Sequence, residues 1–391
     1  MQEILQYYRR NTTEYVPQNI ATTPEINALI ERDAVVAVGV SGGKDSQACA
    51  IAVSRYLDTI GHQGPRVLIH ADLGRVEWKD SLPTCERLAE QIGWELMVVR
   101  RKAGDMMDRW LGRWRNNVTR YEKLECVKLI LPWSTPSMRF CTSELKVAVI
   151  TSALKKRFPG RDIINAAGIR REESAQRRKM PVSTSQPKLE RKGYAGLNWN
   201  PIIEWNLEDV ITAIKSARLE LHEGYTRYQM SRISCAYCIM SSEEDLQSST
   251  ACPDNVAIYR EMVDLEITST YAFQGSRWLA DVAPQLLSAK TRSDAQEAKE
   301  KAAIRQRLES EIPGSLMYVK GWPTSVPDHH EANILARIRR DIANLIQMDA
   351  QYLTADAVQT RYQELIAQNS AKNCRKKETH VPKVEPLAFS W

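Results

Sequence analysis

Short apolar runs alternate with longer amphipathic stretches through the first half of the chain. The apolar runs have the length of buried strands, and the stretches between them carry apolar residues at helical spacing. The expected strands cover residues 35–40, 66–70, 95–99 and 161–167, and the expected helices include residues 47–57 and 77–92. Strands and helices that alternate in this way predict an α/β fold with a doubly wound, parallel sheet.

Changes in this pattern divide the chain into four expected regions. A helical segment precedes the first strand and the α/β domain follows. A cysteine-rich segment then leads into a helical C-terminal region, whose apolar stripes are expected to form a core or a contact with a second copy or another protein. The four regions span residues 1–33, 34–220, 221–282 and 283–391, with a helical insertion at 100–132 and a basic tail from residue 372.

The insertion places tryptophans among arginines. Such a mixture can stack on the bases of a nucleic acid, or it can be an amphipathic helix that buries its tryptophans. Trp110 and Trp114 share one helical face, which favours burial in a core.

Composition places the chain among ordinary globular proteins. Of its 391 residues, 43% are hydrophobic and 26% charged, and no apolar run approaches the length of a membrane span. The polar residues that follow Met1 do not form a secretory signal, so a cytoplasmic protein is expected. Eight cysteines are too few for a disulfide scaffold in a chain of this size.

Positive charge is concentrated in one stretch. The net charge of +6 permits a polyanionic partner without requiring one. Residues 170–192 hold eight basic side chains against three acidic ones. This stretch is expected either to follow nucleic-acid phosphates or to be a solvated or nucleotide-facing loop.

The strongest chemical signal is the turn Ser41-Gly42-Gly43-Lys44-Asp45-Ser46, called the pyrophosphate loop below. It follows the first strand and opens a helix, so its backbone N–H groups and the positive end of the helix dipole face one spot, where phosphates bind. A Walker A loop is excluded, because Gly39 is one residue too close and Asp45 replaces the magnesium-binding hydroxyl. The plain alternative is a glycine turn that only connects strand and helix.

Other candidate residues follow the second and fourth expected strands. In open α/β sheets ligands bind outside the carboxyl ends of the strands. Asp72 would contact adenosine or a magnesium-bound water, or else cap the next helix. Gly168 suits close approach to a ribose or phosphate, and Arg170 suits an anion. Residues 180–200, with two prolines and two glycines, are expected to form a loop near the site.

A second cluster consists of cysteines. Cys235 and Cys238 are spaced to bind one metal from a single turn, and Cys252 offers a third ligand. Cys141 is the best candidate for a fourth, because Thr142 or Ser143 is expected to cap a helix there and the helix dipole favours a thiolate. Four thiolates suit a [4Fe–4S] cluster, with tetrahedral zinc or no metal as alternatives. The remaining helical cysteines, Cys49, Cys85 and Cys126, are expected to be buried thiols.

Together these motifs resemble the phosphoadenosine phosphosulfate reductase-like family of the adenine nucleotide α-hydrolase superfamily. The resemblance covers roughly residues 30–255 and implies a Rossmann-like fold. Its motifs are the pyrophosphate loop, His70-Ala71-Asp72-Leu73-Gly74, Arg139-Phe140-Cys141-Thr142 with Leu145-Lys146, Gly168-Ile169-Arg170 with Glu173-Ser174, and the three later cysteines.

Two branches of that family differ in their chemistry. True reductases lack the loop lysine and carry a catalytic cysteine in a C-terminal Glu-Cys-Gly-Leu-His motif. This chain keeps Lys44 and Asp45, and its last cysteine lies in Asn373-Cys374-Arg375-Lys376. The pattern is therefore closer to the ATP-using sulfur-transfer protein of DNA phosphorothioation.

The resemblance implies an enzyme that opens ATP between its α and β phosphates and adenylates a substrate, with release of pyrophosphate. Lys44, Asp45 and Arg170 would be catalytic. ATP with Mg²⁺ would be bound by the pyrophosphate loop, Asp72, Gly168 and Arg170, and the four cysteines would hold the cluster. Sulfur transfer to DNA or tRNA, with a sulfur-donor protein, is the implied role. The alternatives are a reductase-type oxidoreductase and a non-catalytic ATP-binding regulatory or partner module.

Overall fold

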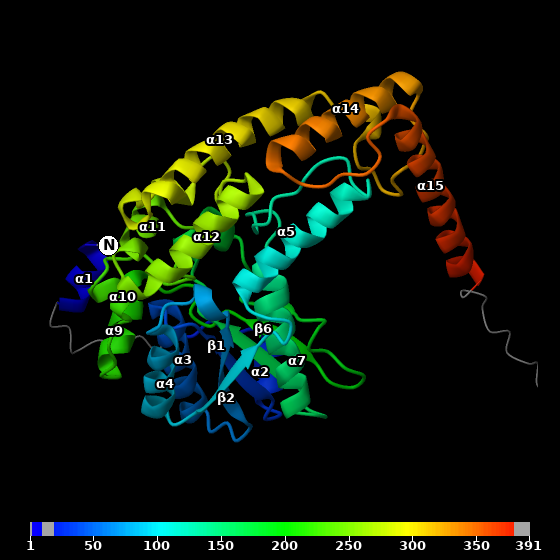
Figure 1. Cartoon of the computed structure of the whole chain (residues 1–391). Coiled ribbons are helices and arrows are strands. Elements are labelled where there is room, and N and C mark those ends of the chain that lie inside the picture. Colours follow the sequence, from blue (N-terminus) through cyan, green and yellow to red (C-terminus); the bar gives the residue numbers. More distant parts are fainter. Residues whose placement is uncertain (1, 10–18, 379–391) are drawn as a thin grey trace, which may run out of the picture. The chain divides into compact units, whose positions relative to one another are not determined.

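The computed structural model describes residues 2–9 and 19–378 (Figure 1). The chain divides into two compact units. Unit 1 comprises Met1–Trp110, Trp133–Val263 and Phe273–Ser288, and unit 2 comprises Leu111–Pro132, Asp264–Ala272 and Ala289–Trp391. The division assigns most of the expected insertion to the same unit as the C-terminal helices. Part of the expected N-terminal segment, residues 10–18, and the end of the basic tail, residues 379–391, lie outside the described residues.

Unit 1 is built on a six-stranded sheet with the order β3-β2-β1-β4-β6-β5. Every neighbouring pair is parallel except β5 and β6, which form an antiparallel edge. The strands are β1 (Val35–Val40), β2 (Arg66–Asp72), β3 (Glu95–Arg100), β4 (Ile163–Ala167), β5 (Ser183–Ser185) and β6 (Gly196–Trp199). The mostly parallel α/β sheet predicted from the sequence is confirmed.

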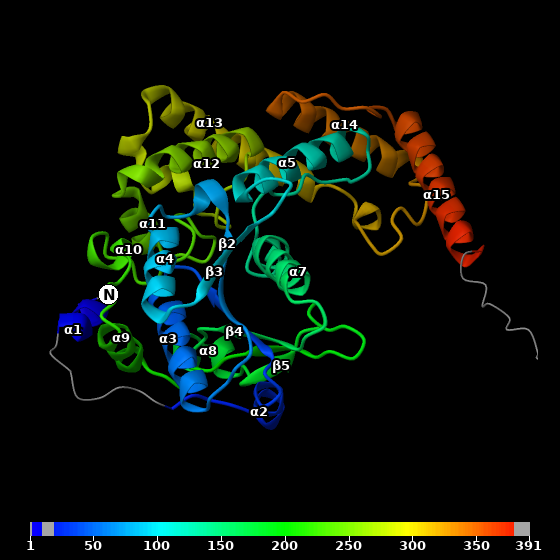
Figure 2. The same cartoon turned by 90° about the horizontal axis from the view of Figure 1, so that it is seen from below.

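Helices cover both faces of this sheet (Figures 1 and 2). Side chains of β1 alternate between the faces, because successive residues of a strand point to opposite sides. Val36 and Val38 pack in the core beneath α3 (Lys44–Thr59), α4 (Ser81–Ile92) and α9 (Leu207–Ser216). Val35 and Ala37 pack on the other face, with residues of α7 (Ala148–Arg157).

The remaining helices of unit 1 are short, and two longer helices contribute residues to both units. The short ones are α1 (Gln2–Arg9), α2 (Pro24–Ile30), α6 (Phe140–Thr142), α8 (Ala175–Arg178), α10 (Glu223–Thr226) and α11 (Glu243–Thr250). Single 3₁₀ turns cover Gly74–Val76, Arg171–Glu173, Pro253–Asn255, Leu279–Asp281 and Pro284–Leu286. The shared helices are α5 (Met106–Glu122) and α12 (Val256–Ser269).

Two local expectations are corrected. The stretch 180–200 is not a plain loop, because it contains β5 and β6, and β6 pairs in parallel with β4. The helix after Cys141 does not begin at a Thr142 or Ser143 cap: it starts at Phe140, passes through a π-helical turn at Ser143–Val147 and continues as α7. Cys141 therefore lies inside the first turn.

Unit 2 is helical, as predicted for the C-terminal region. It contains α13 (Ala289–Ser310), the 3₁₀ turn Gly314–Leu316, α14 (His329–Ile346) and α15 (Ala355–Glu378). Ile338 and Ile342 of the expected stripe are fully buried, as are Val358 and Tyr362 of the next helix. These stripes form the core of unit 2. None of the helices in the described part of the chain combines the length and apolarity that a bilayer span needs.

Both tryptophans of the insertion are buried. Trp110 lies edge-on to Trp133 in unit 1, and Trp114 lies edge-on to Tyr271 in unit 2. Their surroundings show that both side chains pack in a core and are not free to stack on bases.

Candidate active site

The pyrophosphate loop lies at the carboxyl end of β1 and leads directly into α3. Gly42 has a φ of +75°, a conformation that side chains disfavour, and a Cβ there would lie 3.0 Å from the Cα of Ser81. Gly43 caps α3 without a side chain. The first-turn amides of a helix have no partner within the helix, so this end of α3 has the form of an anion site.

Side chains from the first turn of α3 hold the loop in shape. The Ser46 hydroxyl donates to the Gly43 carbonyl at 2.8 Å and accepts from the Ser41 amide at 3.3 Å. The Gln47 amide donates to the Gly42 carbonyl at 3.2 Å. The loop conformation is therefore fixed by its own residues.

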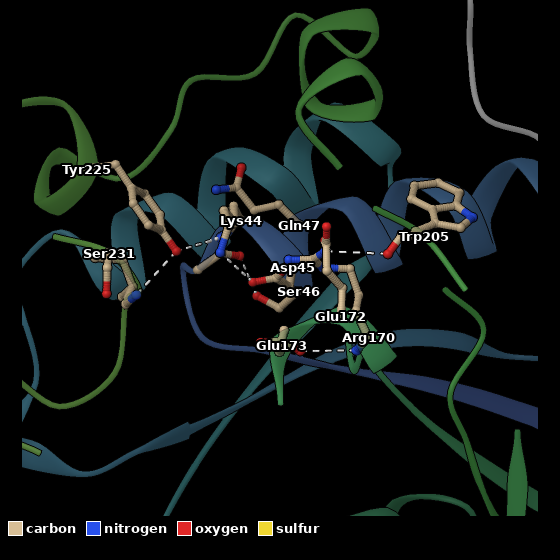
Figure 3. A network of polar contacts seen from close by, with 12 residues as sticks. Lys44, Asp45, Ser46, Gln47, Arg170, Glu172, Glu173, Trp205, Tyr225 and Ser231 are labelled. Atoms are coloured by element: carbon tan, nitrogen blue, oxygen red, sulfur yellow. Dashed lines mark hydrogen bonds and ion pairs between the residues drawn. The ribbon is translucent and has the colours of Figure 1, made fainter. Parts of the chain in front are cut away.

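Charged side chains form a chain along the loop (Figure 3). Lys44 Nζ lies 2.8 Å from one oxygen of Asp45, and Arg170 Nε donates to the other at 2.7 Å. Arg170 also pairs with Glu172. The side chains of Lys44 and Arg170 are only 6% and 5% exposed, so two buried cations share one carboxylate.

These three groups are all charged at neutral pH. Burial by itself lowers the pKa of Lys44, but Tyr225 and Asp45 outweigh it and hold that pKa above its usual value. Burial by itself raises the pKa of Asp45, but the charges of Lys44 and Arg170 outweigh it and hold that pKa below its usual range.

Gly168 places Arg170 against the loop. β4 pairs with β1, so the residues after both strands meet at one edge of the sheet. A Cβ at Gly168 would lie 2.3 Å from the Asp45 carbonyl oxygen and 2.9 Å from the Ser46 nitrogen. The amide of Arg170 donates to Glu173 at 3.0 Å, and its Nη1 lies 3.4 Å from the Trp205 carbonyl. The structure thus brings Gly168 and Arg170 to the loop, as their positions after a strand led us to expect.

Tyr225 and His222 also contact the site, and the sequence analysis missed both. The Tyr225 hydroxyl accepts from the amides of Lys44 at 3.3 Å and Ile233 at 3.2 Å. His222 Nδ1 accepts from the Gly224 amide at 2.9 Å, and its Nε2 lies 3.3 Å from the Ser81 hydroxyl. Burial lowers the pKa of His222 to about 4, so this imidazole is neutral. No local pattern marks either residue, because α10 has only four residues and is distant in sequence.

Asp72 has structural partners. β2 does neighbour β1, which puts Asp72 at the same sheet edge as the loop. One of its oxygens accepts from the Gly74 amide at 2.7 Å, and the other pairs with Arg100. Asp72 therefore caps the turn after β2, and a contact with adenosine or a magnesium-bound water stays a prediction.

The four cysteines are not arranged as a metal site. Burial is the main cause that raises the pKa of Cys235 to about 12, with further contributions from Cys238, Glu77 and Cys141. Cys252 is buried, and its hydrogen bond with Tyr228 raises the pKa of that tyrosine. Within residues 2–9 and 19–378, no group of three or more His, Cys, Asp or Glu side chains has a geometry that could hold a metal ion. The described residues thus show no preformed four-thiolate centre, and that ligand set stays a prediction.

The basic stretch 170–192 is partly used inside the chain. Arg170 is buried at the loop, Arg171 pairs with Glu204, and Arg177 pairs with Glu173. Its remaining cations extend through the turn before β6, where Arg191 donates to the Lys155 carbonyl. Arg170 lies at the pyrophosphate loop. A nucleotide-facing role for it and a nucleic-acid role for the other cations both stay predictions.

Comparison with known proteins places this architecture in a family. The model of the phosphoadenosine phosphosulfate reductase domain matches residues 35–240, a little over half of the chain. Comparison with curated proteins gives no match. Among solved structures, the U34-tRNA thiolase NcsA from Methanococcus maripaludis, with its [4Fe-4S] cluster, is similar over 68% of this chain and 79% of its own, at 15% identity and a TM-score of 0.36. That structural likeness is too distant to bear on function. The family match confirms the resemblance seen in the motifs, and the chain belongs to the phosphoadenosine phosphosulfate reductase domain family.

Proposed function

We propose that the protein is an ATP pyrophosphatase that adenylates an acceptor. ATP would bind with its β and γ phosphates at the pyrophosphate loop, and the acceptor would attack the α phosphorus. The bond from that phosphorus to the bridging oxygen breaks, and pyrophosphate leaves with the electron pair. The observation that carries the proposal is the pair of buried cations, Lys44 and Arg170, beside the first turn of α3, whose N-cap residue Gly43 has no side chain to occupy its amides.

The residues of the loop have separate roles in this proposal. Loop amides would hold the phosphates, while Lys44 and Arg170 would neutralise the charge that develops on the leaving pyrophosphate. Asp45 holds both cations in place before ATP binds. Its carboxylate is also the type of ligand that Mg²⁺ accepts together with phosphates, and the ion would add positive charge there.

We propose nucleic acid, DNA or tRNA, as the acceptor class. In a later step, sulfide-level sulfur from a donor protein would attack the adenylated atom of the acceptor, so that a bond to sulfur forms as the bond to AMP breaks. The intact loop lysine supports ATP cleavage over the reductase alternative, because the reductase branch lacks that lysine. The C-terminal context of Cys374 supports the same choice, since it differs from the reductase motif. The cations of residues 178–192 would contact the acceptor's phosphates.

Lys44→Ala tests the proposal. With bulk tRNA or sheared DNA as acceptor, pyrophosphate release from ATP should fall by ~10²-fold or more, because a charge that stabilises the transition state is lost. Lys290→Ala is the matched control, since Lys290 is exposed on α13 and pairs with Asp294. Release at the parental rate in the Lys44 variant would refute the proposal.

A second candidate is a non-catalytic ATP-binding module. The observation in its favour is that Asp45 already satisfies both cations, so the site is stable without turnover. The same assay separates the two functions. ATP binding with no release of AMP or pyrophosphate, with either acceptor, would favour the module.

A further inference from the structure

The Tyr225 hydroxyl joins two segments that are far apart in the sequence. It lies between the amide of Lys44, in the first turn of α3, and the amide of Ile233, two residues before Cys235. Tyr225 is 1% exposed, and Figure 3 shows its ring directed at Lys44. The Lys44 ammonium lies 5.5 Å from the centre of that ring.

The hydroxyl is fully used as an acceptor. A phenol oxygen has two acceptor lone pairs, and the two amides occupy both. Burial raises the pKa of Tyr225, so the hydroxyl is neutral at physiological pH. Neither amide can therefore move without changing the contacts of the same oxygen atom.

Ile233 lies in a segment held at fixed points. The amide and hydroxyl of Ser231 both donate to Asp245 at 2.7 Å, and the Ala236 amide donates to the Val76 carbonyl at 2.7 Å. Tyr225 supplies the contact between these two anchors. It also connects this segment to the pyrophosphate loop, since Gly43 faces both the Tyr225 oxygen and Ile233.

The Lys44 amide has a second potential acceptor once phosphate is bound. First-turn amides of a helix are the groups that bind phosphate at a helix N-terminus. A charged phosphate oxygen is a stronger acceptor than a neutral phenol. Bound nucleotide would thus compete with Tyr225 for the Lys44 amide and leave the Tyr225 oxygen with one of its two partners.

We propose that Tyr225 is a positioning residue that couples occupancy of the pyrophosphate loop to the segment carrying Cys235 and Cys238. This inference rests on the proposed function, because it needs nucleotide phosphates at the loop. Coupling between two sites acts in both directions, so a change in the cysteine segment also changes nucleotide affinity.

Hydrogen exchange of the full chain, followed by mass spectrometry, tests the coupling. The probe is α,β-methylene-ATP with Mg²⁺, and its binding is measured separately by calorimetry. In the parent protein, exchange of the peptide that contains residues 231–240 should change by at least about fivefold when the probe binds, because the Tyr225 oxygen then has one amide partner instead of two. A change of this size is typical of coupled sites. In Tyr225→Phe the peptide should exchange fast with or without the probe, so the difference should fall below about twofold.

Tyr259→Phe is the matched control. Its hydroxyl is also buried, accepts the amide of Ala283 at 3.1 Å and donates to the Leu279 carbonyl at 2.9 Å, and both of these partners lie outside the pyrophosphate loop. This variant should keep the parental response. Should Tyr225→Phe fold poorly, Ile233→Pro removes the other donor to the same oxygen, and the probe-dependent difference should again disappear.

Two outcomes would overturn the inference alone. One is a parental response to the probe in Tyr225→Phe, and the other is an unresponsive peptide in parent protein that binds the probe. Failure of the parent protein to bind the probe in calorimetry would instead overturn the proposed function, and the inference with it.

Discussion

Asp45 is the residue on which the charges of the site depend. One of its oxygens contacts Lys44 and the other contacts Arg170. A buried charge without a partner costs several kcal/mol, so this shared carboxylate allows both cations to be buried at the loop before any phosphate arrives. An incoming triphosphate meets cations that are already in place, and it would replace Asp45 as the partner that they share.

His70 should make stability depend on pH. Its ring nitrogens lie 3.0 Å from the Val40 carbonyl and 3.1 Å from Glu77. Burial alone lowers its pKa, but contacts with Cys85 and Glu77 raise it to about 10. The native state therefore binds a proton more tightly than the unfolded chain, whose His pKa is about 6.5. Stability from this group is complete below about pH 6.5 and is lost as pH rises towards about 10.

Urea unfolding at pH 6.5 and pH 9.5 measures this effect. The parent protein should lose free energy of unfolding, on the order of a few kcal/mol, between the two pH values, and His70→Asn should lose clearly less. His62→Asn is the control, because burial lowers the pKa of His62, so any effect of this group on stability with rising pH has the opposite sign to that of His70. An equal loss in the parent and the His70 variant would contradict the assignment.

At the scale of elements, the site depends on how closely the end of β4 approaches the start of α3. In Gly168→Ala the new methyl group would meet the Asp45 carbonyl carbon at 2.6 Å. Backbone atoms on both sides must then move, and overpacking of this kind costs about 1–3 kcal/mol. We expect that loss in urea unfolding, together with at least about tenfold weaker ATP binding, which corresponds to 1.4 kcal/mol.

Gly112→Ala should have the opposite effect on stability. Gly112 lies inside α5, and a Cβ there meets nothing within 4 Å. Replacing a helical glycine with alanine should raise stability by about 0.5–1 kcal/mol. If both variants shifted the unfolding midpoint in the same direction, close packing at Gly168 would not explain its effect.

The strands and short helices show how far sequence patterns can predict structure. β1 was predicted with its observed bounds, because an uninterrupted apolar run followed by a glycine turn leaves little ambiguity. β6 was missed because it has four residues and is flanked by turn-forming residues, so its strand character comes from pairing with β4. Arg170 could be placed near the loop from its position just after an expected strand, whereas Tyr225 reaches the loop from a short helix that carries no periodic signal.

At the scale of the whole molecule, the open question is whether cysteines from distant segments bind one metal centre. Protein purified without oxygen should contain about four iron atoms per chain and absorb broadly near ~400 nm if Cys141, Cys235, Cys238 and Cys252 hold a [4Fe–4S] cluster. Cys235→Ser should lose most of that iron, because a thiolate ligand is removed. Cys126→Ser, a partly buried thiol of unit 2, should keep it.

The two alternatives, a zinc site and no metal, predict different metal contents in the same measurement. One zinc per chain without colour would assign a structural zinc site. Protein with neither metal would remove the four-cysteine prediction, and would agree with the arrangement seen for the described residues. The spacing of cysteines in the sequence can suggest metal ligands. Only the tertiary fold decides whether thiols from a helix start, a turn and a buried loop come close enough to bind one metal.

Unit 2 is assembled from stretches that lie far apart in the chain. Arg339 of α14 donates to the Glu122 carbonyl at 3.1 Å, Arg361 of α15 donates to the Lys123 carbonyl at 3.0 Å, and the Leu129 amide donates to Glu309 at 3.2 Å. The ribosome therefore releases residues 111–132 long before the helices that complete their surroundings exist. Until those helices are synthesised, residues 111–132 lack these partners and are accessible to chaperones and proteases.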